Sequence, residues 1–205
     1  MDPRFKRPER ACHPSVMDPC QRLWEWVGDA KNADLPLAES MTLATADRTG
    51  APSARTVLLK AVEGDELVFG TTLNSLKGRQ LLANPLVALV LHWPSLGRQV
   101  RVAGVARPGT EEESDALWGS RGRDARLVDV VSEEGAPLAS TDEFRAAFEA
   151  ADAAHGEEIS RPAGWAAVRV RAEIVEFWSA GERRMAVREE FRRGEGGWTV
   201  RLLSP

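Results

Sequence analysis

The feature that most constrains the fold is a run of short β-type segments, joined by turn signals, between residues 41 and 107. Met41–Ala46 and Pro52–Val62 flank an Asp-Arg-Thr-Gly turn, which is the pattern of a β-hairpin. Glu66–Thr72 follows a Glu-Gly-Asp turn and predicts a third strand. Short strands that follow one another through tight turns favour an antiparallel sheet.

The later part of the sequence extends this sheet. Leu86–Trp93 is nearly continuous in apolar residues, which predicts a strand buried on both faces. Arg98–Arg107 alternates as a return strand, and Gly104 within it predicts a bulge. Further strands are expected at Trp165–Val170, Ile174–Trp178, Met185–Arg193 and Trp198–Leu203.

Helices are expected outside these strands. Asp18-Pro19 is a cap followed by proline and predicts a helix start. The apolar face of this helix is expected to contain Leu23, Trp24, Val27 and Ala30. A second helix is expected to begin near Asn74 or Ser75 and to end at Asn84, because the residue before a proline resists helical geometry.

Two capping boxes predict further helices. Thr110 with Glu113 opens a helix to about Ser120, and Ser140 with Glu143 opens another. The second of these has an apolar stripe of Phe144, Ala147, Phe148 and Ala151. Residues 121–126 between them read as a basic, glycine-bearing link.

These elements predict a mainly β fold with peripheral helices, in which the sheet forms a closed or half-closed antiparallel barrel. Residues 1–17 carry three prolines among charges and are expected to form a flexible arm. Residues 18–205 are expected to form a single domain.

Composition excludes several classes of function. The net charge of -4 argues against a general nucleic-acid binder, and no segment approaches the roughly 18 apolar residues needed to span a membrane. The start of the chain lacks an apolar signal segment, so a cytoplasmic location is expected. Cys12 and Cys20 form either a disulfide or a pair of reduced thiols, and a cytoplasmic chain favours the thiols.

The inventory of reactive side chains is small. There are three histidines and no tyrosine, no cluster has metal-ligand spacing, and neither a Gly-x-Ser-x-Gly elbow nor a Walker A loop occurs. If the chain is an enzyme, a bound cofactor is therefore expected to carry the difficult chemistry.

An anion site is expected where the second and third strands lead into the following helix. An apolar run ends at Lys60, and a loop then brings Ser75, Lys77 and Arg79 to the helix start. Free N–H groups at a helix start, together with nearby cations, attract anions. We interpret the anion as the phosphate of a bound cofactor.

Eight segments carry a resemblance to a known family, in the same order and at similar spacing. They are Asp18-Pro19, Met41–Ala46, Arg55–Lys60, Ser75-x-Lys77, His92–Pro94, Arg98–Val102, Glu176–Trp178 and Gly197–Pro205. In these segments the chain resembles the pyridoxamine 5′-phosphate oxidase family, which includes phenazine-biosynthesis oxidases. The resemblance implies a split β-barrel, a homodimer with FMN at the subunit interface, and oxidation of a small molecule with O2 as acceptor.

The resemblance also implies roles for individual residues. The FMN contacts fall on Arg55, Val57, Lys60, Thr71, Ser75, Lys77, Gln99, Trp178 and Arg188. Substrate contacts fall on Lys60, Arg121 and Arg184, while no metal site and no catalytic side chain is implied. Structural alternatives stay open: Gln99 as an outward strand residue, Trp178 as core, and the arginines as a solvated surface.

The sequence departs from the family pattern at several positions. A Gln-Ser pair of the flavin site falls on Glu134 and Gly135. Of four residues that hold the substrate phosphate, a tyrosine and a serine fall on Leu117 and Ala125, and the substrate-site histidine falls on Ala186. Each lost charge-assisted hydrogen bond is worth about 1.5–3 kcal/mol, so a changed ligand is expected.

Three hypotheses follow. The first is an FMN-dependent oxidase that dehydrogenates a small cyclic or aromatic substrate other than pyridoxine phosphate, in specialised metabolism. The second is a genuine pyridoxine or pyridoxamine 5′-phosphate oxidase with an altered phosphate pocket. The third is a flavin-binding dimer without catalysis.

Overall fold

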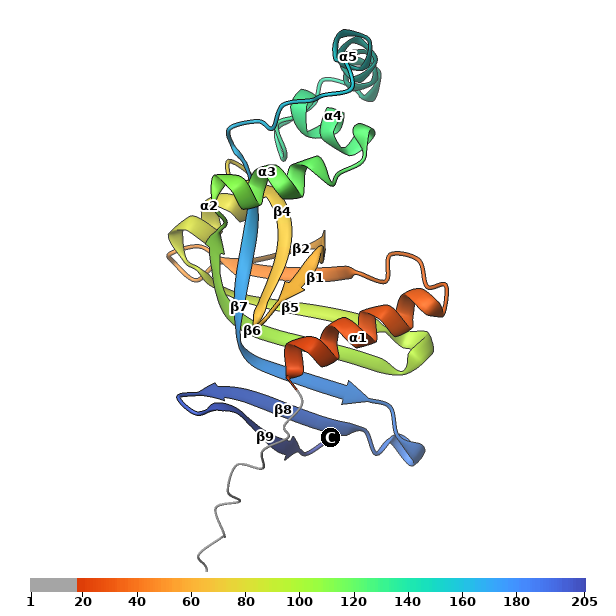
Figure 1. Cartoon of the computed structure of the whole chain (residues 1–205), viewed down its shortest axis with the longest axis vertical. Helices are drawn as coiled ribbons and strands as arrows, with labels where there is room; N and C mark the ends of the chain where they lie inside the picture. Colours follow the sequence, from red (N-terminus) through yellow and green to blue (C-terminus); the bar gives the residue numbers. More distant parts are fainter. Residues whose placement is uncertain (1–17) are drawn as a thin grey trace, which may run out of the picture.

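A computed structural model describes residues 18–205, which contain a single nine-stranded sheet (Figure 1). Its strands are β1 (Ser40–Ala46), β2 (Pro52–Leu58), β3 (Ala61–Glu63), β4 (Glu66–Thr72), β5 (Leu86–Trp93), β6 (Arg98–Pro108), β7 (Trp165–Ser179), β8 (Val187–Gly194) and β9 (Gly197–Leu203). They pair in the order β2-β1-β5-β6-β7-β4-β3, and β8 and β9 extend the sheet from the far end of β7. Every pairing is antiparallel.

The helices lie at the periphery, as predicted. They are α1 (Pro19–Asn32), α2 (Leu76–Ala83), α3 (Glu111–Gly119), α4 (Arg123–Val131) and α5 (Thr141–Ala154). In Figure 1, α1 crosses the lower half of the sheet, while α3, α4 and α5 rise from its upper end. None of the helices within residues 18–205 has the length and apolar character needed to cross a bilayer.

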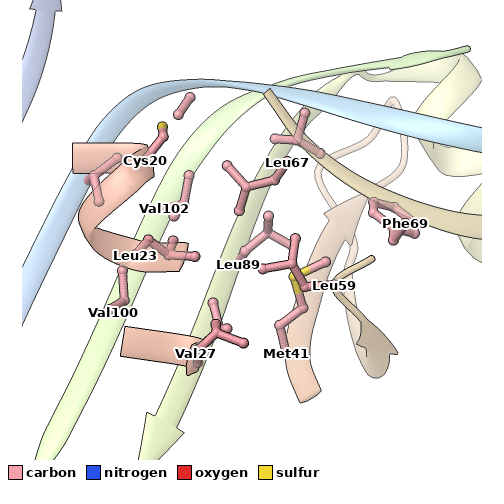
Figure 2. Close-up of a cluster of buried hydrophobic side chains, with 14 of the residues drawn as sticks. Cys20, Leu23, Val27, Met41, Leu59, Leu67, Phe69, Leu89, Val100 and Val102 are labelled. Carbon is pink, nitrogen blue, oxygen red and sulfur yellow. The ribbon is translucent and has the colours of Figure 1, made fainter. Parts of the chain in front are cut away.

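The core lies inside the curl of the sheet, where α1 covers it. Figure 2 shows Leu23 and Val27 of α1 facing Val100, Leu89 and Met41 of the strands. All five are at most 1% exposed, so the strands and α1 share one continuous apolar interior. The predicted split barrel with peripheral helices is confirmed.

The predicted return strand Pro52–Val62 is wrong in its extent, because the strand breaks before Lys60. β2 ends at Leu58, and the backbone N–H of Leu59 donates to Glu39 O at 2.9 Å. The N–H of Lys60 instead donates to Val68 O of β4 at 2.8 Å. At this point the chain leaves β1 and joins β4, which closes one side of the half-barrel.

β5 is not buried on both faces within one chain, contrary to prediction. Val87, Leu89 and Leu91 point into the core, whereas Leu86 and His92 are exposed on the outer face. The apolar run therefore combines a core face with an outer face that residues 18–205 leave uncovered.

β6 and β7 form the longest pairing. The predicted bulge is confirmed, since the register shifts between Ala103 and Gly104. A Cβ on Gly104 would lie 2.3 Å from Arg171 O, so the close backbone approach requires glycine. The two strands predicted at residues 165–170 and 174–178 are one continuous strand of 15 residues.

The apolar face of α1 was predicted correctly except at Trp24, which is 39% exposed. Trp26 is the buried residue instead, and its ring lies edge-on to Phe177 at 4.9 Å. Cys20 is buried, and burial raises the pKa of its thiol to about 12. The predicted flexible arm and Cys12 lie outside the described residues.

The link predicted at residues 121–126 is also wrong, because α4 begins at Arg123. The capping box of Thr110 and Glu113 is present in full, and Ser140 caps α5 by accepting from the N–H of Glu143. The stripe on α5 is shallower than predicted: Phe148 and Ala151 pack against a small apolar cluster around Trp118, and Ala147 is exposed.

Candidate functional site

Arg55 is held by a cluster of polar side chains between β1, β2 and α2. Its guanidinium donates to Thr45 Oγ1 at 2.6 Å and to Ser53 Oγ at 2.7 Å. Both hydroxyls in turn donate to Gln80 Oε1 at 2.6 Å. Thr45 and Gln80 are buried, so the guanidinium is fixed in one orientation before any ligand arrives.

The start of α2 brings a buried ammonium close to this cluster. Ser75 caps the helix, donating to Thr72 O at 2.6 Å and accepting from the N–H of Gly78. The side chain of Lys77 is only 7% exposed and forms an ion pair with Glu134, from the loop between α4 and α5. Arg79, by contrast, is exposed and turns back to the carbonyl of Asn74.

Thr71 adds an unsatisfied donor. This residue is 4% exposed near the end of β4, and its Oγ1 has no hydrogen-bond partner within residues 18–205. A buried hydroxyl without a partner costs free energy, so Thr71 marks a position where a ligand would supply the missing hydrogen bond. We refer to Arg55, Thr71, Ser75 and Lys77 as the α2 group.

Electrostatics link the α2 group to a neighbouring ion pair. Burial lowers the pKa of the Arg55 guanidinium, and the Glu134 carboxylate opposes that shift. Burial raises the pKa of the Asp129 carboxyl, while Arg121 opposes the rise. The charges of Glu134 and Lys77 also act on Asp129, so these groups share one electrostatic environment.

Arg121 is held in place from three sides. Its Nη2 donates to Asp129 Oδ2 at 2.6 Å and to Ala125 O at 3.0 Å. The guanidinium carbon also lies 5.2 Å from the centre of the Trp165 ring, which favours a cation–π contact. Arg121 is therefore an ordered, half-buried cation rather than part of a solvated loop.

Lys60 and Arg121 line one cavity of about 390 Å³. The other lining residues are Leu58, Gly70, Ser120, Gly122 and Ala125. Lys60 is exposed at this cavity, and Arg121 forms part of its wall. Leu117 packs instead against the apolar cluster around Trp118, so it offers the cavity no hydrogen bond.

A second set of predicted residues lies side by side across three strands. Gln99 on β6 pairs with Trp178 on β7, and Trp178 pairs with Arg188 on β8. Arg188 donates to Glu176 Oε1 at 2.9 Å and to Ser204 O at 3.0 Å. We call these three residues the Gln99 row.

The α2 group and the Gln99 row lie on opposite faces of the sheet. Arg55 pairs with Leu43, and the register continues through Leu89 to Val102, all of which point into the core. Gln99 is three residues from Val102, so its side chain points to the outer face. Within one chain the two sets therefore do not face a common volume.

Two predicted site residues fall elsewhere. Val57 is 8% exposed and its side chain belongs to the apolar core, so it offers a ligand no side-chain hydrogen bond. Arg184 is exposed, has a φ of 66°, and follows Arg183 in the short turn before β8. It does not line the cavity of Lys60 and Arg121.

Sequence reasoning missed Asp129 and Gln80. Asp129 lies on α4, and Arg121 reaches it from the residues just before that helix begins at Arg123. Recognising the helix α4 in the sequence would have identified the pair of Arg121 and Asp129. The role of Gln80 depends on contacts with β1 and β2, which no local pattern marks.

The fold and these groups together define a class of protein. A half-barrel whose α2 group offers two fixed cations and an unsatisfied hydroxyl is suited to a phosphate-bearing cofactor. Within residues 18–205 no cluster of side chains is arranged to hold a metal ion. The class is that of split-barrel proteins that bind a flavin nucleotide.

Comparisons with known proteins agree with this class. Residues 28–155 match the model of the pyridoxamine 5′-phosphate oxidase family, and residues 165–205 match the pyridoxine 5′-phosphate oxidase C-terminal dimerisation region. The chain belongs to the pyridoxamine 5′-phosphate oxidase family. As the resemblance implied, it is an FMN-dependent oxidoreductase.

Individual relatives support the assignment. The chain is 40% identical to a pyridoxine/pyridoxamine 5′-phosphate oxidase of Gluconobacter oxydans, over 92% of this chain and 94% of that protein. It is 37% identical to one of Granulibacter bethesdensis, over 100% of this chain and 99% of that protein. Among solved structures, PhzG from Burkholderia lata, in complex with tetrahydrophenazine-1-carboxylic acid, is similar with a TM-score of 0.88 and 26% identity, covering 96% of this chain and 98% of that one.

Proposed function

We propose that the chain is an FMN-dependent oxidase that dehydrogenates a small cyclic or aromatic substrate bearing one acidic group, with O2 as acceptor, in specialised metabolism. The observation that carries the proposal is the cavity of Lys60 and Arg121, which keeps two cations. Leu117 and Ala125 provide it with no side-chain hydrogen bond, although the family pattern places a tyrosine and a serine there. A phosphate group would lose two of its four expected partners.

The α2 group fits the phosphate of FMN. Arg55 presents a fixed guanidinium, and Lys77 presents a buried ammonium in the first turn of α2. A doubly charged phosphate satisfies both cations, and the unpartnered hydroxyl of Thr71 supplies one further donor. Ser75 orders the helix start rather than donating to the ligand, because its hydroxyl is engaged with Thr72.

A second copy of the chain completes the site. Because the Gln99 row faces away from the α2 group of its own chain, both sets meet one ligand only if they come from different copies. The match of residues 165–205 to a dimerisation region supports a homodimer. The uncovered outer face of β5, with Leu86 exposed, supports the same assembly.

FMN held by the α2 group would supply the site with a hydride acceptor and a route for the electrons to O2. The chain's own residues bind and orient the substrate. Lys60 and Arg121 hold its acidic group, and Trp165 with Asp129 keeps the Arg121 guanidinium in place. No titratable side chain lines the cavity besides these two cations, so the substrate's own amine or a water molecule takes the proton.

Arg184 is the least supported of the proposed substrate contacts. It lies in an exposed turn next to Ala186, where the family pattern has its histidine. Since Arg184 lies between Trp178 and Arg188 of the Gln99 row, it would reach a substrate only from the second copy.

A genuine pyridoxine or pyridoxamine 5′-phosphate oxidase is the second candidate. The observation that favours it is the name of the curated relatives, which are 37–40% identical to this chain. PhzG also aligns over nearly the whole of both chains, and the tetrahydrophenazine-1-carboxylic acid in its complex favours the first candidate.

The test is a substrate comparison on the purified, FMN-loaded protein. Pyridoxine 5′-phosphate, pyridoxamine 5′-phosphate and a set of partly reduced ring carboxylates are supplied in air, and peroxide formation is measured. We expect turnover of at least one carboxylate and turnover of the two phosphates lower by at least about 100-fold, since two hydrogen bonds to phosphate are missing. Efficient turnover of the phosphates alone would overturn the first candidate in favour of the second. A flavin that no substrate bleaches under anaerobic conditions would leave only the non-catalytic hypothesis.

A further inference from the structure

Glu134 supplies the anion that satisfies Lys77. The two side chains form an ion pair, although the side chain of Lys77 is 7% exposed and that of Glu134 is 51% exposed. A buried ammonium requires an anion, whereas a half-exposed carboxylate is well solvated without a cation. The pair is therefore essential for Lys77 and dispensable for Glu134.

The charge of Glu134 reaches the second cation of the α2 group as well. Its carboxylate acts on the guanidinium of Arg55, in opposition to the effect of burial. Glu134 thus lies within range of both groups that would hold a phosphate. No other acidic side chain forms an ion pair with Lys77 within residues 18–205.

The loop that carries Glu134 has few contacts to restrain it. Glu134 lies between the end of α4 at Val131 and the start of α5 at Thr141. Gly135 follows it with a φ of 87°, and a Cβ on Gly135 would meet no atom within 4 Å. The carboxylate can therefore leave Lys77 without disturbing packed side chains.

We infer that Glu134 sets the affinity for the cofactor by competing with the cofactor's phosphate for Lys77 and Arg55. This inference rests on the proposed flavin site. A phosphate and a carboxylate at one ammonium repel each other, so the phosphate must displace Glu134 before it binds. Glu134 is consequently an affinity-determining residue, and its removal strengthens binding rather than weakening it.

The test uses the full chain, freed of flavin, and titrates FMN by the quenching of flavin fluorescence. Glu134→Gln removes the charge and keeps the shape, and Glu133→Gln is the matched control because Glu133 is exposed in the same loop. We expect Glu134→Gln to lower the Kd for FMN by about tenfold at low salt, and Glu133→Gln to change it by less than about twofold. Riboflavin, which lacks the phosphate, serves as a second ligand and is expected to bind both variants as it binds the unaltered chain.

Each outcome has a distinct meaning. If the unaltered chain binds FMN and Glu134→Gln binds it equally well or more weakly, the inferred competition is overturned while the proposed function stays intact. If Glu134→Gln strengthens riboflavin binding as much as FMN binding, the carboxylate acts on the ring or ribityl chain, and the inference also fails. If no form of the chain binds FMN, the proposed function itself fails.

Discussion

Replacing Lys77 with methionine removes the buried ammonium while keeping a long unbranched side chain. In the structure the Lys77 side chain is 7% exposed, and its ammonium has Glu134 as its anion. In the complex the phosphate would take the place of Glu134, through one or two charge-assisted hydrogen bonds. Each contributes about 1.5–3 kcal/mol, so we expect the Kd for FMN to rise by between about 10-fold and 150-fold for a single bond.

The folded state should tolerate this change. Glu134, the partner left behind, is half-exposed and regains solvation, so the free energy of unfolding without flavin is expected to change by less than about 1 kcal/mol. Fluorescence titration gives the Kd, and urea unfolding gives the stability. Arg79→Met is the control, because Arg79 lies on the same helix but is exposed and turned to Asn74. Equal FMN affinities for the two variants would refute the phosphate role of the α2 group.

Three further predictions concern stability. Trp26→Ala is expected to lower the free energy of unfolding in urea by about 3–5 kcal/mol, and Trp24→Ala by less than about 1 kcal/mol, because only Trp26 is buried. Similar losses for the two variants would contradict the packing of α1. Gly70→Val is expected to lower the midpoint temperature of thermal unfolding, since a Cβ at this position would lie 2.4 Å from the Trp165 ring. An unchanged midpoint would show that the ring has room to move. Burial opposes ionisation of Glu66, but hydrogen bonds from two arginines hold the pKa of its carboxyl below the usual value. The stabilisation by the Glu66 carboxylate is therefore fully present above its pKa in the unfolded chain, and it is lost as the pH falls through its pKa in the folded chain. Glu66→Gln should reduce the loss of stability on acidification, which unfolding at pH 7 and pH 3 measures.

Much of the fold follows from local patterns in the sequence. Alternating strands, tight turns, the capping box at Thr110 and the bulge at Gly104 each depend on residues close together in the chain, and each was predicted correctly. The errors occurred where contacts between residues far apart in the chain determine the local structure. The break before Lys60 exists because β4 offers a new hydrogen-bond partner, and residues 53–63 contain no proline or glycine to mark it.

The error at Trp24 has a geometric cause. Leu23, Val27 and Ala30 already define a stripe at helical spacing. Trp26 borders that stripe at about 60° from Leu23, whereas Trp24 lies about 100° from Leu23. Both tryptophans are large and apolar, so composition alone did not separate them. A strict application of the helical period would have selected Trp26.

The sequence names candidate residues for the site but not their arrangement. The resemblance identified Arg55, Lys77 and Arg121, and the structure gives each of them a fixed environment. The division between the two faces of the sheet emerged only from strand register, which the sequence does not specify across non-consecutive strands. The pairing of Glu134 with Lys77, 57 residues apart, likewise depends on how α4 and its loop fold back.

The most direct test of a flavin site shared between two copies is complementation between two defective chains. Lys77→Met disables the α2 group, and Trp178→Ala disables the Gln99 row, so each variant alone should bind FMN weakly. When the two are unfolded together and refolded, random pairing makes about half of the dimers mixed, and each mixed dimer has one site with both sets intact. The account predicts that tight FMN binding returns at about a quarter of all sites, whereas no recovery in a preparation shown to contain mixed dimers would contradict it.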